Sequence, residues 1–179
     1  MRILLVLALT VCSVMFVNAQ QNTFATTLKN QMIADWERAK AYTNEYLETM
    51  PADKYSFRAQ DSIRTFAQQM LHLSAANNWL GSNGTGASMM WAGRRLEQAP
   101  GAQSKDSVKY FVNASYDHVI EGIKAFDVAK FEEKSKSGNF ELTRLAWLLK
   151  AFEHQTHHRG QTTIYIRLVG VKPPNEKLF

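Results

Sequence analysis

The sequence predicts an all-α protein folded as a four-helix bundle. Four stretches of about 20 to 30 residues place apolar side chains at a spacing of three and four, as amphipathic helices do. Neither an alternation of strands and helices nor an internal repeat interrupts this pattern. The 179 residues, 45% of them hydrophobic, supply enough apolar surface for the core of one domain.

The first residues of the chain have the pattern of a secretory signal peptide. Arg2 precedes an apolar run over residues 3–17, and Val17-Asn18-Ala19 fits the site that a signal peptidase cuts. We therefore expect cleavage of residues 1–19, a mature domain over residues 20–179, and export to the periplasm or the extracellular space. An uncleaved membrane anchor is the alternative, although the apolar run is shorter than the ~20 residues that span a bilayer.

Each helical stretch of the mature domain ends at proline, glycine or polar residues. A long connection rich in Gly, Ser and Asn precedes the third stretch, and a polar link precedes the fourth. Connections of such different length favour a bundle with at least one crossover. The final stretch has the β-branched density of a strand near its end, but it continues a helical pattern without a turn. The predicted helices cover residues 24–50, 61–80, 104–126 and 140–169, and the two connections cover residues 81–103 and 132–139.

Charge and cysteine content exclude several classes of function. Lys and Arg number 21 against 16 Asp and Glu, and the two signs are interspersed, so no basic patch for nucleic acid forms. The single cysteine, Cys12, lies in the predicted signal peptide, which excludes a disulfide framework. We expect a small-molecule substrate or ligand, no nucleic acid, and no membrane contact after signal cleavage. No residue is assigned to an organic cofactor, and a homodimer stays open.

Histidines supply the residues with metal-binding chemistry. His154 and His158 are four residues apart, so on a helix they lie about 40° apart around the axis and ~6 Å along it, and can bind one ion. His72 is the best third ligand, because it borders the apolar face of the second helix, where an imidazole needs a partner. His157 points about 100° away from His158, although a pair with His154 stays open. His118 stands beside acidic residues and fits a solvated or ion-paired position.

The closing part of the chain carries a longer motif. The run His154-Gln-Thr-His-His-Arg-Gly-Gln161 is followed by Tyr165, Arg167, Gly170 and the pair Pro173-Pro174. With a long first helix and a histidine in the second, this motif resembles the DinB/YfiT-like superfamily over residues 24–179. The resemblance implies a four-helix bundle whose metal site combines a second-helix histidine with a histidine pair on the last helix. It thereby assigns the metal ligands to His72, His154 and His158.

The implied site has three neutral imidazoles and an open coordination position, as catalytic metal sites do. We expect a divalent ion, zinc by default, with nickel, iron or manganese as alternatives, because nitrogen ligands do not select sharply. No catalytic residue is assigned. Gln155 stands where an HExxH protease has its glutamate, and we expect Glu153 to point to another side of the helix. The carboxylates considered for the cavity are Asp35, Asp117 and Glu121.

Three functions are consistent with such a site. The first is an exported, metal-dependent hydrolase or transferase that acts on a small molecule; the resemblance implies thiol transfer, which some members of the superfamily perform. The alternative is a non-catalytic module that binds a metal or a small ligand. A metal that only stabilises the bundle ranks last, because a domain of this size folds without one.

Overall fold

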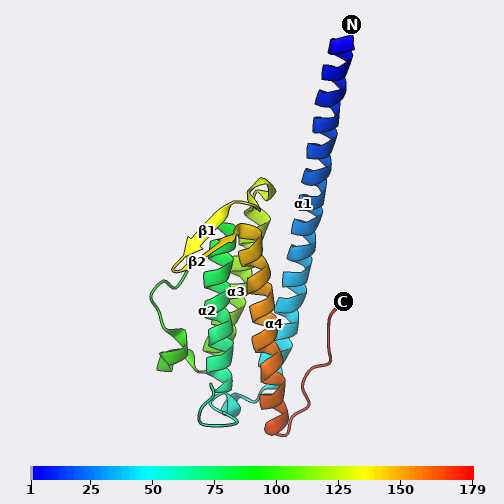
Figure 1. The fold of residues 1–179 in the computed structure, drawn as a ribbon. Helices are drawn as coiled ribbons and strands as arrows, with labels where there is room; N and C mark the ends of the chain where they lie inside the picture. Colours follow the sequence, from blue (N-terminus) through cyan, green and yellow to red (C-terminus); the bar gives the residue numbers. More distant parts are fainter. Residues whose placement is uncertain (1) are drawn as a thin grey trace.

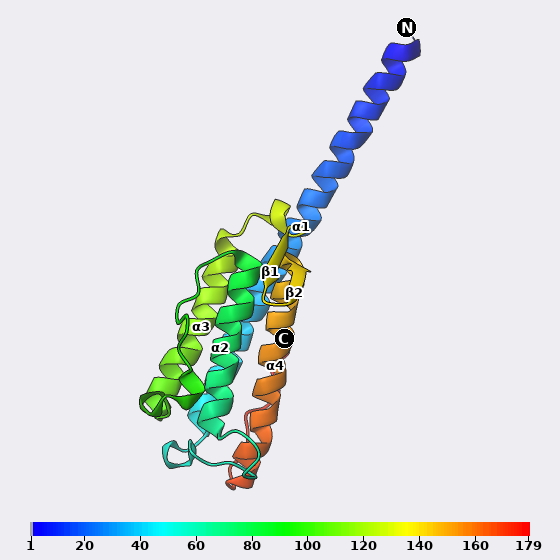
Figure 2. The same cartoon turned by 60° about the vertical axis from the view of Figure 1, so that its left-hand side comes forward.

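The computed structural model describes residues 2–179, with side chains from Thr23 onward. Four α-helices build the bundle (Figure 1). Helix α2 packs against α3 and α4, and α1 packs against the same two helices from the other side (Figure 2). The prediction of a four-helix bundle is therefore confirmed. The helices are α1 (Arg2–Thr49), α2 (Phe66–Thr85), α3 (Lys105–Ala125) and α4 (Arg144–Leu168).

Helices α2 and α3 run parallel, so the chain must return along the whole bundle between them (Figure 1). Residues 86–104 make this crossover and contain two 3₁₀ turns, Leu96–Gln98 and Pro100–Ala102. The first turn packs against α2. The crossover expected from the long connection is present, and it brings loop side chains to the middle of a helix.

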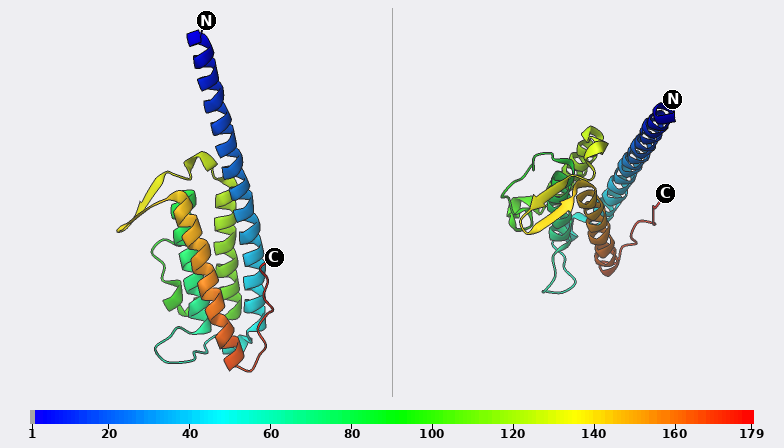
Figure 3. Two further views of the ribbon diagram at one scale, coloured as in Figure 1. Left: turned by 45° about the vertical axis from the view of Figure 1, so that its right-hand side comes forward. Right: turned by 45° about the horizontal axis from the view of Figure 1, so that its top comes forward.

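The N-terminal half of α1 projects beyond the bundle (Figure 3). The predicted signal peptide, residues 1–19, lies outside the part of the chain whose side chains are described. Among the described side chains, from residue 23 to the C-terminus, no helix combines the length and apolarity needed to cross a membrane. The C-terminal segment returns along α1, where Arg38 Nη1 donates to the carbonyl of Lys177 at 2.8 Å.

Side-chain caps set the starts of the helices. Thr65 Oγ1 accepts from the backbone of Gln68, and the Gln68 side chain accepts from the backbone of Thr65, which together make a capping box. Helix α2 therefore begins at Phe66, later than the predicted start at residue 61. Ser104 caps α3 through the backbone of Ser107, as its position in the sequence predicts.

The predicted end of the second helix before its glycines is wrong. A Cβ at Gly81 would lie 2.6 Å from a methyl carbon of Val119, and one at Gly84 would lie 2.6 Å from Leu148. The two glycines therefore let α3 and α4 approach α2 closely, and the helix continues through them. It stops at Gly86, whose φ of 81° suits a glycine C-cap.

A β-hairpin replaces the predicted polar link and the predicted start of the last helix. Strands β1 (Lys134–Ser137) and β2 (Phe140–Thr143) pair antiparallel. They are joined by a two-residue loop that begins at Gly138 with a φ of 59°. Helix α4 then starts at Arg144 behind the Thr143 cap. The hairpin covers the end of the bundle where α2 stops and α4 begins (Figure 1).

Aromatic side chains fill the centre of the bundle. Trp36, Trp147, Tyr116 and Phe66 are among the largest fully buried residues, and the rings of Trp36 and Tyr116 meet edge to face at 5.6 Å. The last part of α4, which has the β-branched composition of a strand, is helical to Leu168, as predicted. This packing fixes α2 and α4 side by side, and the candidate site lies between them.

Candidate metal centre

The three predicted ligands meet between α2 and α4. His72 comes from α2, while His154 and His158 lie one turn apart on α4, and one ring nitrogen of each lies within 4.8 Å of the others. The ring centroids are 4.3 Å apart for the α4 pair, and 4.6 and 5.2 Å from His72 to His158 and His154. Nitrogens bound to one ion at 2.0–2.1 Å lie at most about 4.2 Å apart, so the limit of 4.8 Å places these three close to metal-binding distance.

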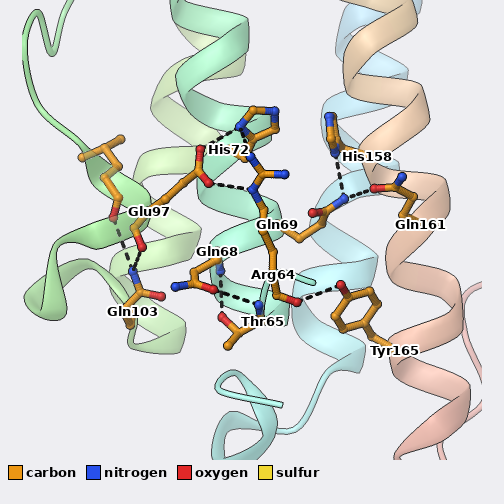
Figure 4. A network of polar contacts seen from close by, with 11 residues as sticks. Arg64, Thr65, Gln68, Gln69, His72, Glu97, Gln103, His158, Gln161 and Tyr165 are labelled. Carbon is orange, nitrogen blue, oxygen red and sulfur yellow. Dashed lines mark hydrogen bonds and ion pairs between the residues drawn. The ribbon is translucent and has the colours of Figure 1, made fainter. Parts of the chain in front are cut away.

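A carboxylate from the crossover orients His72. Glu97 Oε1 lies 2.7 Å from His72 Nδ1, and Arg64 Nε donates to Glu97 Oε2 at 2.6 Å (Figure 4). An ionised carboxylate only accepts, so Nδ1 carries a proton, and in the neutral ring Nε2 is then the nitrogen with the lone pair. Burial works to raise the pKa of Glu97, but the hydrogen bonds from Arg64 and His72 hold that pKa below its usual value.

Two amides perform a similar role for His158. As placed, Gln69 Nε2 lies 2.7 Å from His158 Nδ1 and also contacts Gln161 Oε1 (Figure 4). The nitrogen of the Gln161 amide lies 2.9 Å from His157 Nε2. An amide rotated by 180° accepts where it donated before. With both amides rotated, the Gln69 oxygen accepts from His158 Nδ1 and from the Gln161 nitrogen, and Nε2 of His158 is left free to bind a metal.

The third histidine, His154, shows whether the three side chains fit a metal ion. His154 Nδ1 is buried and has no hydrogen-bond partner among the described residues, a costly state that a bound cation or its ligand would relieve. Burial, and then the charges of neighbouring histidines, lower the pKa of His154 to about 4 and that of His158 to about 3. Both rings are therefore neutral at pH 7, with lone pairs for a divalent ion, and the three side chains fit one.

Several other residues considered from the sequence lie away from this cluster. His118 is half-buried, with Nε2 2.8 Å from Ser82 Oγ, and burial lowers its pKa, so among the described residues it has neither the solvated nor the ion-paired position that the sequence indicated. The carboxylates proposed for the cavity form ion pairs at the surface instead. These pairs are Asp35 with Arg38, Asp117 with Lys40, and Glu121 with Lys124.

The residues around the closing motif divide into buried structure and site. Arg159 donates to the side-chain carbonyl of Gln155 at 2.8 Å and lies 4.7 Å above the Tyr42 ring, so its guanidinium is engaged within the core. His157 lies outside the three-nitrogen cluster but shares a pocket with His154 and Glu153. Glu153 is exposed where it lines this pocket and is not part of the cluster.

Sequence reasoning missed Glu97, Arg64 and Gln69. Each lies far from the motif on α4, and none stands in a pattern that indicates its role. The single available indication was the long connection that carries Glu97, because long loops in compact domains often cover a site.

Two cavities flank the histidines. One, of about 710 Å³, is lined by the polar groups that hold the ligands, among them Arg64, Gln69 and Glu97. The other, of about 530 Å³, lies toward the hairpin and is lined mainly by apolar side chains, together with His154, His157, Lys150 and Glu153. Both volumes fall in the range of small-molecule sites.

Comparison with known proteins shows which solved structures this chain resembles. Three solved structures share the fold: a DinB-like protein from Bacillus cereus ATCC 10987 (TM-score 0.69, 17% identity), a DinB-like protein from Bacillus subtilis (TM-score 0.65, 16% identity) and a conserved protein from Enterococcus faecalis (TM-score 0.63, 15% identity). The matches cover 82%, 83% and 78% of this chain and 95%, 96% and 95% of theirs. No curated protein matches the chain.

At such identities the solved structures establish the fold alone. The sequence itself matches the model of the DinB family over residues 15–178, nearly its whole length. The resemblance indicated by the closing motif is thereby confirmed: the chain belongs to the DinB family.

Proposed function

We propose that His72, His154 and His158 bind one divalent metal ion, zinc in the first place, and that the protein uses it as a hydrolase or transferase on a small molecule. The observation that carries this proposal is the meeting of three histidine nitrogens within 4.8 Å. Support comes from the unpartnered, buried Nδ1 of His154, which no described residue satisfies.

The protein's own side chains prepare the site for such chemistry. Glu97 fixes the ring of His72, Gln69 fixes the ring of His158, and burial keeps His154 neutral. When bound, a dication with three protein ligands and an open position polarises a carbonyl or lowers the pKa of a group that coordinates it. The cavities on both sides offer space for a substrate.

A non-catalytic binding module is the second candidate, and one observation favours it. Glu97, which lies against the cluster, is engaged by both His72 and Arg64, so it is not free to act as a general base. Glu153 is a further carboxylate, exposed where it lines a pocket together with His154. Turnover by the metal-loaded wild type separates the two candidates, and Glu153→Gln then tests whether this carboxylate takes part.

Metal analysis of the purified protein tests the binding step. We expect about one metal ion per chain in the wild type and a loss of bound metal in His154→Ala. The matched control is His118→Ala, which removes a half-buried imidazole outside the cluster. Equal metal content in the two variants would reject the site. Turnover of the loaded wild type on ester, amide and thiol-transfer substrates, compared with His158→Ala, then tests catalysis.

The proposal includes export, on the evidence of residues 1–19. A small-molecule substrate would then be met outside the cytoplasm, as a periplasmic or extracellular compound. Mass spectrometry of the protein isolated from its host tests this: the expected N-terminus is Gln20. An intact chain that starts at Met1 in the soluble cell contents would contradict it.

A further inference from the structure

We propose that the pocket between α2, α4 and the hairpin binds the apolar, aromatic-sized body of the substrate, with an anionic head group directed at the metal. The part of the inference that concerns the head group rests on the proposed function. The part that concerns the apolar body depends on the pocket alone. His154 belongs both to the metal cluster and to the lining of this pocket. A molecule in the pocket therefore has one end beside the metal position.

The walls of the pocket are built to be apolar. Trp79 and Trp147 lie edge to face with ring centroids 5.5 Å apart. Both indole N–H groups are engaged by the hairpin: Trp79 donates to Ser137 Oγ at 2.9 Å, and Trp147 donates to the carbonyl of Ser135 at 3.0 Å. With these donors satisfied, the indoles offer the pocket apolar surface.

Strand β2 supplies the outer wall. Leu142 is half-buried, while Phe140 is 60% exposed at the edge of the pocket. An exposed large aromatic ring that borders an apolar cavity loses its contact with water when a ligand fills the cavity, which favours binding. The volume of about 530 Å³ suits a small molecule with one or two rings.

The charges around the pocket select the two ends of the ligand. Lys150 and Glu153 both lie at its rim and are exposed, so their opposite charges give the rim no net sign and fit an uncharged body. A dication held by three neutral imidazoles keeps its full charge and attracts an anionic head. The ligand class is therefore a small aromatic or branched aliphatic anion.

Calorimetric titration of the full purified chain with two naphthalene probes tests the inference. Naphthalene-2-methanol carries the body without a charge, and 2-naphthylacetate adds the anionic head. We expect both to bind, and Phe140→Asp to weaken both at least tenfold. Leu149→Asp is the control, because Leu149 is 52% exposed on α4 and does not line the pocket. If Phe140→Asp does not fold, Leu142→Trp replaces it in the test, because the larger side chain fills the same space and should likewise weaken both probes.

Zinc separates this inference from the proposed function. We expect one equivalent to tighten 2-naphthylacetate at least tenfold and to leave naphthalene-2-methanol within twofold. Failure of both probes to bind, or an equal effect of the Phe140 and Leu149 variants, overturns the pocket even if zinc binds. Zinc that binds without tightening the acetate overturns the head-group assignment alone. Failure of zinc to bind overturns the metal function as well, while the pocket for the body stands.

Discussion

Replacement of Glu97 should weaken metal binding without touching a ligand. The residue lies on the crossover, 2.7 Å from His72 Nδ1, and holds that ring with its other nitrogen toward the cluster. Groups that orient metal-ligating histidines typically contribute 10–100-fold to metal affinity. That range corresponds to about 1.4–2.8 kcal/mol.

The structure indicates which of two Glu97 variants loses more metal affinity. Glu97→Gln keeps an oxygen that accepts from His72 but removes the charge, and the Glu97 side chain is 29% exposed, so water screens part of the loss. We expect about a tenfold decrease in affinity. Glu97→Ala also removes the acceptor and leaves Arg64 beside the ring without its carboxylate, so the decrease should approach a hundredfold.

Competition with a chromophoric zinc chelator measures these affinities. Glu121→Ala is the control, because its carboxylate pairs with Lys124 at the surface and is 69% exposed. We expect this variant to bind zinc as the wild type does. If both Glu97 variants also retain wild-type affinity, the crossover does not orient the ligand, and the reasoning on His72 is refuted.

Three further predictions concern packing, the amide contact and pH. Gly84→Ala should destabilise the fold by about 1–3 kcal/mol, because its Cβ would overlap α4, while Gly160→Ala, which meets open space, should stabilise it by up to about 1 kcal/mol; urea denaturation measures both. Gln69→Leu should weaken zinc binding about tenfold and Gln69→Glu should preserve it, in the same chelator assay. In the metal-free protein the pKa values of His154 and His158 lie below the unfolded value of 6.5. As the pH falls, the unfolded chain therefore binds protons at these two residues before the folded chain does. The stability that the two neutral histidines contribute is complete above about pH 6.5, so the melting temperature should fall as the pH drops from 7 toward 4. A melting temperature that does not change over this range contradicts the prediction.

The local part of the site was predictable from the sequence. The four-residue spacing of His154 and His158 places both on one helix face wherever that helix lies. The placement of His72 followed from the apolar residues around it, because their face had to point into the bundle. Helical geometry thus specifies which ligands are available.

Other features depend on packing between distant segments. Glu97 reaches His72 because the crossover returns along α2, and no pattern within residues 81–103 encodes that path. The glycines of α2 indicated a helix end, yet they serve close approach of α3 and α4, which only the assembled bundle reveals. The strands of the hairpin are four residues each and rich in Lys and Ser, too short and polar for their periodicity to indicate a sheet.

X-ray absorption spectroscopy of the chain loaded with one equivalent of zinc tests the metal centre most directly. We expect three histidine nitrogens at about 2.0–2.1 Å from the zinc, with at least one further light ligand at the open position. His72→Ala should reduce the imidazole count to two. A zinc ion surrounded by oxygen ligands alone, or an unchanged spectrum after removal of His72, would contradict it.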